Sequence, residues 1–499
     1  MKTLQQILLA GSIAFMPFCL NAQDNQRWSL EKEGHIRWQP EKIESHQDHI
    51  EMSGKTVSVV LRYGVENGKF ILNKSMVWPL LRTIPNNTHA SLMRRYNWDV
   101  LDMVNINGRS LTSELVESIE LKGILKVTSN YDEGRRGQWR IIREYFPSTD
   151  QPALVESYQI INTGKNELAI ELPQVNQKSI TDPKKGVTGS FCIETLTDKS
   201  GHFTLQPGES LTFGASLLAY KEGEKAPLID VQKEKSQREA LVDELMNKLV
   251  LETPDPIIDR MFAFSKIRGC ESIYETKGGP MHGPGGESYY AAIWANDQAE
   301  YINPFFPFVG YEYGNASALN SYLHFARFMN NEWKPIPSSI IAEGIDIWNG
   351  AGDRGDAAMI AYGAARYALA RGNKQEAETL WPLIEWCLEY CRRQLNEEGV
   401  VASDSDELEG RFPSGDANLC TSSLYYDALL STSYLCKELG KSGASTYLKQ
   451  AAILRKNMER YFGAQVEGFD TYAYYKGNDV LRSWICIPLT VGIDERAEG

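Results

Sequence analysis

The chain has 499 residues, of which 42% are hydrophobic and 23% charged, a composition that excludes an intrinsically disordered protein and indicates two or three globular domains. Its net charge of −13 argues against a nucleic-acid or anionic-membrane partner, because phosphate groups require a basic surface. After the N-terminus, no apolar run approaches the length of about 18 residues that a membrane span needs. A protein with this net negative charge is better suited to a neutral ligand.

Residues 1–22 have the pattern of a secretory signal peptide. Lys2 supplies the positive charge, residues 7–20 are apolar, and Ala22 provides the small residue before the expected cleavage. We therefore expect an exported protein, either periplasmic or secreted. The eight cysteines are scattered, and no CxxC or paired-histidine spacing supports a metal site, so we expect neither a cofactor nor a dense disulfide framework.

Residues 23–225 are expected to form a β-sandwich. Short stretches such as Val57–Leu61 and Trp139–Tyr145 combine alternating polarity with β-branched and aromatic content. Turns rich in asparagine, proline and glycine separate them, as is typical of sandwiches. Residues 226–253 are charged and carry leucines at four-residue spacing, which predicts a helix that links the sandwich to the next domain.

Residues 254–499 are expected to form an α/α toroid of helical hairpins. The apolar stripe from Leu380 to Cys391 has the 3.6-residue period of an amphipathic helix, and Asn373 with Glu376 forms a capping box before it. Long connections rich in aromatic, acidic and glycine residues indicate functional loops that converge on one face. Further helices are expected at residues 257–274, 315–329, 419–439 and 442–462.

The first of three candidate loops ends at residues 293–297. Trp294 offers a flat apolar face of the kind on which a sugar ring stacks, while Asn296 and Asp297 offer hydrogen bonds to hydroxyl groups. The alternative is a tryptophan of the core, with Asp297 serving only as a helix N-cap.

The second candidate loop covers residues 343–356. Asp353 and Asp356 would be explained as the cap and first turn of the next helix, where the helix dipole favours negative charge. That explanation leaves out the neighbouring Trp348 and Arg354, so a functional role for the loop is favoured.

The third candidate loop, residues 404–415, holds four carboxylates within six positions, followed by Arg411. Mutual repulsion raises the pKa of at least one carboxyl group if it is partly buried. A glycosidase needs such an acid to protonate the leaving oxygen. A solvated acidic loop is the alternative, and a calcium site is a minor one because the spacing is not that of an EF-hand.

Together the three loops resemble those of the six-hairpin glycosidases, a group that includes glucoamylases and the glucosidase part of glycogen-debranching enzymes. The resemblance implies a β-sandwich before an (α/α)6 toroid. Residues 293–297 look like the group's Trp-x-Arg-Asp segment, which holds the terminal sugar, with Asn296 in place of the arginine. Residues 353–360 are similar to the Asp-Ala segment that opens an inner helix. Residues 408–411, upstream of Leu424–Leu429, look like the group's segment that carries the general acid. The resemblance places this acid nearest Glu409, with Asp406 as the second candidate.

The leading functional hypothesis is an inverting exo-glycosidase that acts on an oligo- or polysaccharide. Glu409 or Asp406 would supply the acid, and further side chains would line one cavity and bind the sugar: Trp294, Asn296, Asp297, Trp348, Arg354, Asp356 and Arg411.

Two other functions stay open. A polysaccharide lyase on an α/α toroid is the first alternative, although only His282 and His324 lie in the helical half to assist proton abstraction. A non-catalytic glycan-binding protein would explain the tryptophan-rich loops but not the clustered acids.

The expected number of helices sets a further condition. A closed toroid of six hairpins should occupy about 350 residues, whereas residues 254–499 offer seven or eight helical segments. We therefore expect an incomplete ring, and we assign no general base within these residues.

Overall fold

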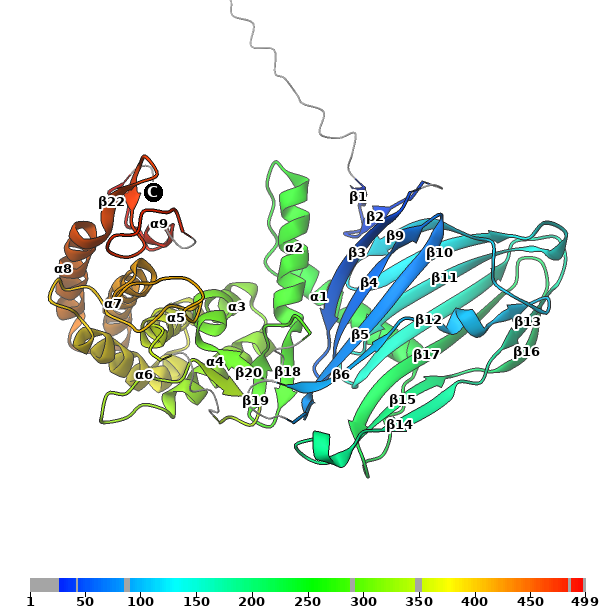
Figure 1. Ribbon diagram of the computed structural model, residues 1–499, viewed down its shortest axis with the longest axis horizontal. Helices are drawn as coiled ribbons and strands as arrows, with labels where there is room; N and C mark the ends of the chain where they lie inside the picture. The colour runs from blue at the N-terminus through cyan, green and yellow to red at the C-terminus, as the bar shows by residue number, and fades with distance from the viewer. Residues whose placement is uncertain are drawn as a thin grey trace, which may run out of the picture.

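The computed structural model describes residues 27–41, 44–84, 90–287, 292–345, 352–482 and 486–496. Along the described chain, a large β-sheet region is followed by a helical region, as the sequence predicted (Figure 1). The expected signal peptide, residues 1–22, lies outside the described residues.

The sheet region is built from antiparallel strands in two packed sheets and a smaller third one. The first sheet has the order β1 (Trp28–Leu30), β2 (Ile36–Trp38), β9 (Glu114–Leu121), β10 (Leu125–Asp132), β11 (Gln138–Pro147), β12 (Ala153–Asn162), β17 (Ser210–Lys221), β15 (Phe191–Thr197) and β14 (Asn176–Ile180). The second has the order β3 (His46–Ser53), β4 (Ser58–Glu66), β5 (Lys69–Arg82) and β6 (Ser91–Tyr96).

The third sheet has the order β16 (Gly201–Leu205), β13 (Leu168–Leu172), β7 (Asn105–Ile106) and β8 (Arg109–Ser110). Short 3-10 turns are η2 (Val100–Met103), η3 (Gly134–Arg136) and η4 (Pro183–Lys185). The sandwich core follows from the period of two along each strand, which sends alternate residues inward. On β4, for example, Val59, Leu61 and Val65 are fully buried and pack against inward residues of β9 to β12.

Helix α1 (Val231–Asn247) joins the two regions. Its first residue, Val231, packs on the sandwich beside Tyr220, whereas Leu245 near its end belongs to the core of the helical region. Arg238 is fully buried between them and donates to the carbonyl oxygens of Gly123 at 2.8 Å and Ser53 at 3.0 Å. One helix therefore anchors both regions to each other.

The helical region contains α2 (Pro256–Glu271), α3 (Asn303–Val309), α4 (Glu312–Ala326), α5 (Asp356–Arg371), α6 (Lys374–Arg393), α7 (Leu419–Leu439), α8 (Ala444–Phe462), α9 (Ile487–Thr490) and a π-helical turn, η5 (Asp297–Ile302). Asn373 is the N-cap of α6, as predicted: its Oδ1 accepts from the backbone N–H groups of Gln375 and Glu376. Glu376 pairs with the side-chain amide of Asn373, which donates to Glu376 Oε1 at 2.9 Å, and not with the backbone N–H that a capping box requires.

Three two-stranded antiparallel sheets lie between the helices of the described residues, and the sequence did not predict them. They are β18 (Ile273–Thr276) with β19 (Gly279–His282), β20 (Ala292–Trp294) with β21 (Ser339–Ile341), and β22 (Gly463–Val466) with β23 (Phe469–Tyr472). Strands of three or four residues are too short to show a period of two.

Helix α5 is the centre of the helical region and packs against α3, α6, α7 and η5. Its small residues explain this position, because they let neighbouring backbones approach closely. A Cβ atom at Gly363 would lie 2.2 Å from the carbonyl oxygen of Ala299 on η5, so only glycine fits there.

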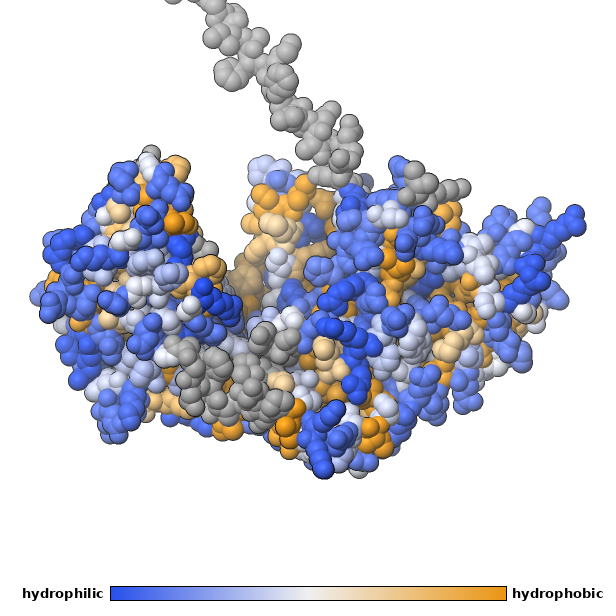
Figure 2. Space-filling view, viewed as in Figure 1, coloured by the Kyte–Doolittle hydropathy of each residue, from blue (hydrophilic) through white to orange (hydrophobic). Residues whose placement is uncertain are grey.

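Apolar surface gathers over α2, beside a hollow that separates α2 from the α8 and β22 end of the molecule (Figure 2). Ile257, Ile258 and Met261 of α2 are exposed there. The expected incomplete ring stays a prediction. No helix in the described residues has the length and apolarity to cross a membrane.

Candidate active site

Arg354 brings the three predicted loops together. Its side chain is 1% exposed and donates from Nη2 to Asp356 Oδ1 at 2.8 Å and from Nη1 to Glu409 Oε1 at 3.3 Å. The same Nη2 lies 3.5 Å from Asn296 Oδ1. Asn296 belongs to the first loop, Asp356 to the second and Glu409 to the third. A buried guanidinium requires such partners, so these contacts fix the loops relative to one another.

The turn before α5 positions Arg354. Gly355 is the N-cap of α5 with φ of +82°, and a Cβ atom there would lie 2.4 Å from Thr421 Oγ1. Asp353 is therefore not the cap of this helix. Its Oδ1 accepts from the Gly355 N–H at 2.8 Å, and its Oδ2 accepts from the Tyr390 hydroxyl at 2.6 Å. Burial raises the pKa of Asp353 to about 6.

Glu407 of the third loop faces the first loop, and only 7% of the residue is exposed. The Tyr301 hydroxyl donates to its two carboxylate oxygens at 3.4 and 3.5 Å, and the Asn296 side chain also bonds to it. Burial raises the pKa of Glu407 to about 7, and the negative charge of Asp297 adds to the shift, while Arg354 opposes it.

Two more carboxyl groups come from η5. Burial and the charge of Glu407 raise the pKa of Glu300 well above its usual range, and its Oε1 is shielded from solvent without a hydrogen-bond partner in the described residues. Burial raises the pKa of Asp297 to about 6, against the attraction of Arg354. Burial therefore raises the pKa of all three carboxyl groups, and the positive charge of Arg354 opposes each of these shifts.

Asp406, the second acid predicted from the sequence, is 1% exposed and fully engaged. Its Oδ2 accepts from the Tyr474 hydroxyl at 2.9 Å and lies 3.5 Å from Arg482, while its Oδ1 accepts from the Leu408 N–H at 2.8 Å. These contacts hold the third loop in place.

Glu409, the first acid predicted from the sequence, has a backbone φ of +57° and a side chain that is 22% exposed. Its Oε1 faces Arg354, and its Oε2 lies 3.5 Å from Arg411 Nη2. Arg411 itself is 69% exposed, at the outer edge of the cluster. Glu409 is thus paired with two guanidinium groups.

The remaining predicted residues are the two tryptophans. Trp294 is half-buried at the end of β20, directly before the segment that carries Asn296. Trp348 lies outside the described residues. A cavity of about 580 Å³ adjoins the second and third loops, and Asp353 and Asp404 belong to its lining. None of the predicted sugar-binding residues that the structure describes lines this cavity, so their lining of one shared cavity stays a prediction. The structure brings five other predicted side chains into one contact network: Asn296, Arg354, Asp356, Glu409 and Arg411. Asp297 lies close enough for the charge of Arg354 to act on its pKa.

Sequence reasoning missed two residues of this site. Glu300 was not considered, because an acid three residues after Asp297 reads as ordinary first-turn chemistry of a helix. Glu407 was recognised only as part of the acidic run. Their proximity depends on the packing of η5 against the third loop, a contact between distant segments that no local pattern contains.

No protein-family model matches the chain, and no match was found among curated proteins. Solved structures do match. One is described as a kojibiose phosphorylase from the human microbiome, with 9% identity, a TM-score of 0.50, and coverage of 87% of this chain and 69% of that one. Another is a bacterial glucoamylase complexed with acarbose, with 11% identity, a TM-score of 0.45, and coverage of 90% and 74%.

The match to the first of these structures confirms, at the level of the fold, the resemblance inferred from the loops. The low identities say nothing about the reaction. The chain therefore shares the overall fold of that structure, and in this chain a β-sandwich precedes the helical domain.

Proposed function

We propose that this protein is a carbohydrate-active enzyme that cleaves glycosidic bonds by acid catalysis, with Glu407 as its proton donor. The single observation that carries the proposal is the position of the Glu407 carboxyl group, which is buried between the first and third loops and contacted by Tyr301 and Asn296. Its raised pKa, about 7, agrees with this position. Such an acid still holds its proton near neutral pH and can donate it to the leaving glycosidic oxygen.

In the proposed reaction, the proton passes from Glu407 to the glycosidic oxygen as the bond between that oxygen and the anomeric carbon breaks. The sugar acquires positive charge, which the surrounding carboxylates stabilise, and water then attacks the anomeric carbon. Attack on the face opposite the leaving group would give inversion. Glu409 and Asp406 remain the alternative donors.

The polysaccharide-lyase alternative is less well supported. Burial lowers the pKa of His282 to about 3, and His324 contacts the Gly278 carbonyl oxygen at 2.7 Å. Neither histidine contacts the Arg354 network in the described residues, so neither is placed to abstract a proton there. A non-catalytic glycan-binding protein would gain nothing from a buried acid, whose ionised form is costly.

The leaving group provides a sharp test. Glu407→Gln should lower kcat/KM for an oligosaccharide by roughly 10²–10⁴-fold, because the amide keeps the shape but has no acidic proton. Hydrolysis of the matching glycosyl fluoride should be affected far less, since fluoride leaves without protonation. Glu397→Gln, an exposed acid in the same domain, serves as the matched control.

Each other outcome has a definite meaning. The same leaving-group pattern in Glu409→Gln or Asp406→Asn, with Glu407→Gln active, would move the acid to that residue. Unsaturated products would indicate a lyase, and retention of glycans without cleavage would indicate a binding protein. Proton NMR of the first sugar released tests inversion.

We also propose that the protein acts outside the cytoplasm, on the basis of its N-terminal 22 residues. Cell fractionation with N-terminal sequencing of the mature protein tests this. An uncleaved chain in the cytoplasmic fraction would contradict it.

A further inference from the structure

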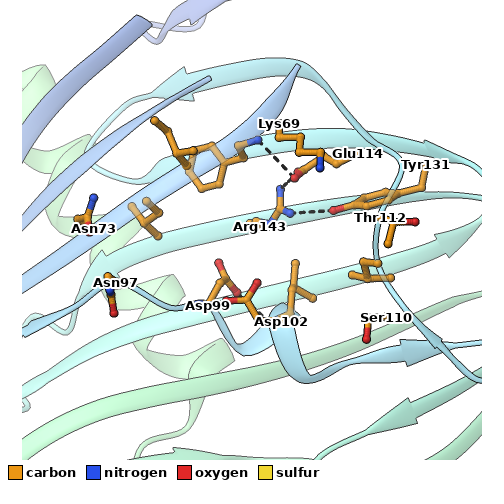
Figure 3. Close-up of a pocket in the computed structure, with 15 residues that line it drawn as sticks. Lys69, Asn73, Asn97, Asp99, Asp102, Ser110, Thr112, Glu114, Tyr131 and Arg143 are labelled. Carbon is orange, nitrogen blue, oxygen red and sulfur yellow. Dashed lines mark hydrogen bonds and ion pairs between the residues drawn. The ribbon is translucent and has the colours of Figure 1, made fainter. Parts of the chain in front are cut away.

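A second polar cavity opens in the β-sandwich, in a different region from the carboxylate cluster. Its volume is about 480 Å³, and strands β5, β9, β10 and β11 contribute to its lining together with the η2 segment (Figure 3). The exposed residues at its mouth are polar and include Asn73, Asn97, Ser110 and Thr112.

Charged side chains form the floor of this cavity. Arg143 is 4% exposed and donates to Ser129 Oγ at 3.0 Å and to the Tyr131 hydroxyl at 2.9 Å. It also forms an ion pair with Glu114 Oε1 at 2.7 Å. Arg143 Nε is buried without a hydrogen-bond partner in the described residues.

Asp99 lies across the cavity from Arg143, at the start of η2 (Figure 3). Its carboxylate accepts hydrogen bonds from the hydroxyl groups of Tyr145 and Tyr158, the latter at 2.9 Å. The charges of Lys74 and Arg143 outweigh the effect of burial and lower the pKa of Asp99. The cavity floor therefore presents fixed, ionised groups of both signs.

Such a floor is unusual for a sandwich, whose inward-facing residues are ordinarily apolar. Buried ion pairs add little to stability compared with hydrophobic residues of the same volume, so stability alone does not account for this network. A cavity of a few hundred Å³ with convergent polar groups is the usual form of a small-molecule site.

The charges define the class of ligand. Lys69 and Arg143 stand against Asp99, Asp102 and Glu114, so neither an anion nor a cation is favoured. A neutral molecule with many hydroxyl groups suits donors and acceptors that alternate around the walls. Apolar surface of Leu111 in the lining suits the C–H face of a sugar ring.

We propose that this cavity binds a hexose unit of a neutral glycan, so that the sandwich holds glycan independently of the helical domain. The site would take a sugar whether or not the Arg354 cluster catalyses cleavage, because none of its residues belongs to that cluster.

Hydrogen–deuterium exchange of the full chain with neutral di- and trisaccharides of glucose, mannose and galactose tests the proposal. At least one sugar should protect residues 69–73 and 99–103 from exchange. The double variant Asn73→Ala/Asn97→Ala should lose this protection and bind that sugar at least tenfold more weakly in calorimetry. Both asparagines are exposed, so their removal should leave the fold intact.

The matched control is Asn176→Ala/Gln177→Ala on the exposed strand β14, which should bind like the unmodified chain. Equal protection in the Asn73→Ala/Asn97→Ala variant would overturn the proposal. So would protection of these segments only by uronic-acid oligosaccharides, only by inorganic phosphate, or by none of the sugars in the panel.

Discussion

Replacing Glu407 by glutamine should stabilise the protein at alkaline pH, although the same change is expected to remove activity. Burial raises the pKa of this carboxyl group from its ordinary value of 4.5 to about 7. The folded state therefore binds the proton more tightly than the unfolded state does. This contribution to stability is fully present below pH 4.5 and is lost as pH rises through about 7.

The shift corresponds to about 3 kcal/mol of unfolding free energy. Since the amide carries no charge at any pH, Glu407→Gln should match the unmodified chain near pH 4.5 and exceed its stability by up to about 3 kcal/mol at pH 8. Urea unfolding at several pH values between 4.5 and 8.5 measures the difference. A gap between the two proteins that does not change with pH would refute a buried carboxyl group of raised pKa at this position.

Three further predictions concern catalysis and packing. The rate of oligosaccharide hydrolysis should fall about tenfold per pH unit above pH 7, as Glu407 loses its proton, and a rate that stays constant to pH 9 would exclude it as the acid. Gly363→Ala should lower the unfolding free energy by about 1–3 kcal/mol in chemical denaturation despite the higher helix propensity of alanine, because the new Cβ would meet Ala299; unchanged stability would contradict the close approach. Arg238→Ala should lower the unfolding free energy by about 3–5 kcal/mol, because buried Glu271 loses its partner at 2.6 Å. Adding Glu271→Gln should restore part of the thermal stability. No recovery in the double variant would mean that the packing of the Arg238 side chain, and not its charge, accounts for the loss.

Elements with a strong period could be predicted from the sequence. The apolar stripe of α6 and its N-cap Asn373 predicted both the type and the start of that helix, since each depends on residues within one or two turns. The two-stranded sheet of β20 and β21 could not be predicted, because its strands pair across more than forty residues and each is only three residues long. That sheet nonetheless joins the first candidate loop to the second.

The candidate site shows the same division. The three loops could be identified from their composition. In the structure, Arg354 contacts a residue of each loop, which agrees with the expectation that the loops converge. The choice among the acids could not be made, because Glu407 and Glu409 are two positions apart in a loop without a regular period. The left-handed backbone of Glu409 and the burial of Glu407 decide which carboxylate is paired with arginine and which faces other acids.

Helix packing contributes to the raised pKa values of the carboxyl groups in the site. Gly363 allows η5 to lie against α5, and η5 carries both Asp297 and Glu300. Burial is the main cause of the raised pKa of Glu407, and the negative charge of Asp297 on η5 adds to it. A larger residue at position 363 would displace η5, weaken the repulsion and lower the pKa of the proposed acid. The small residues of α5, visible in the sequence only as a packing signal, therefore also contribute to the raised pKa of Glu407.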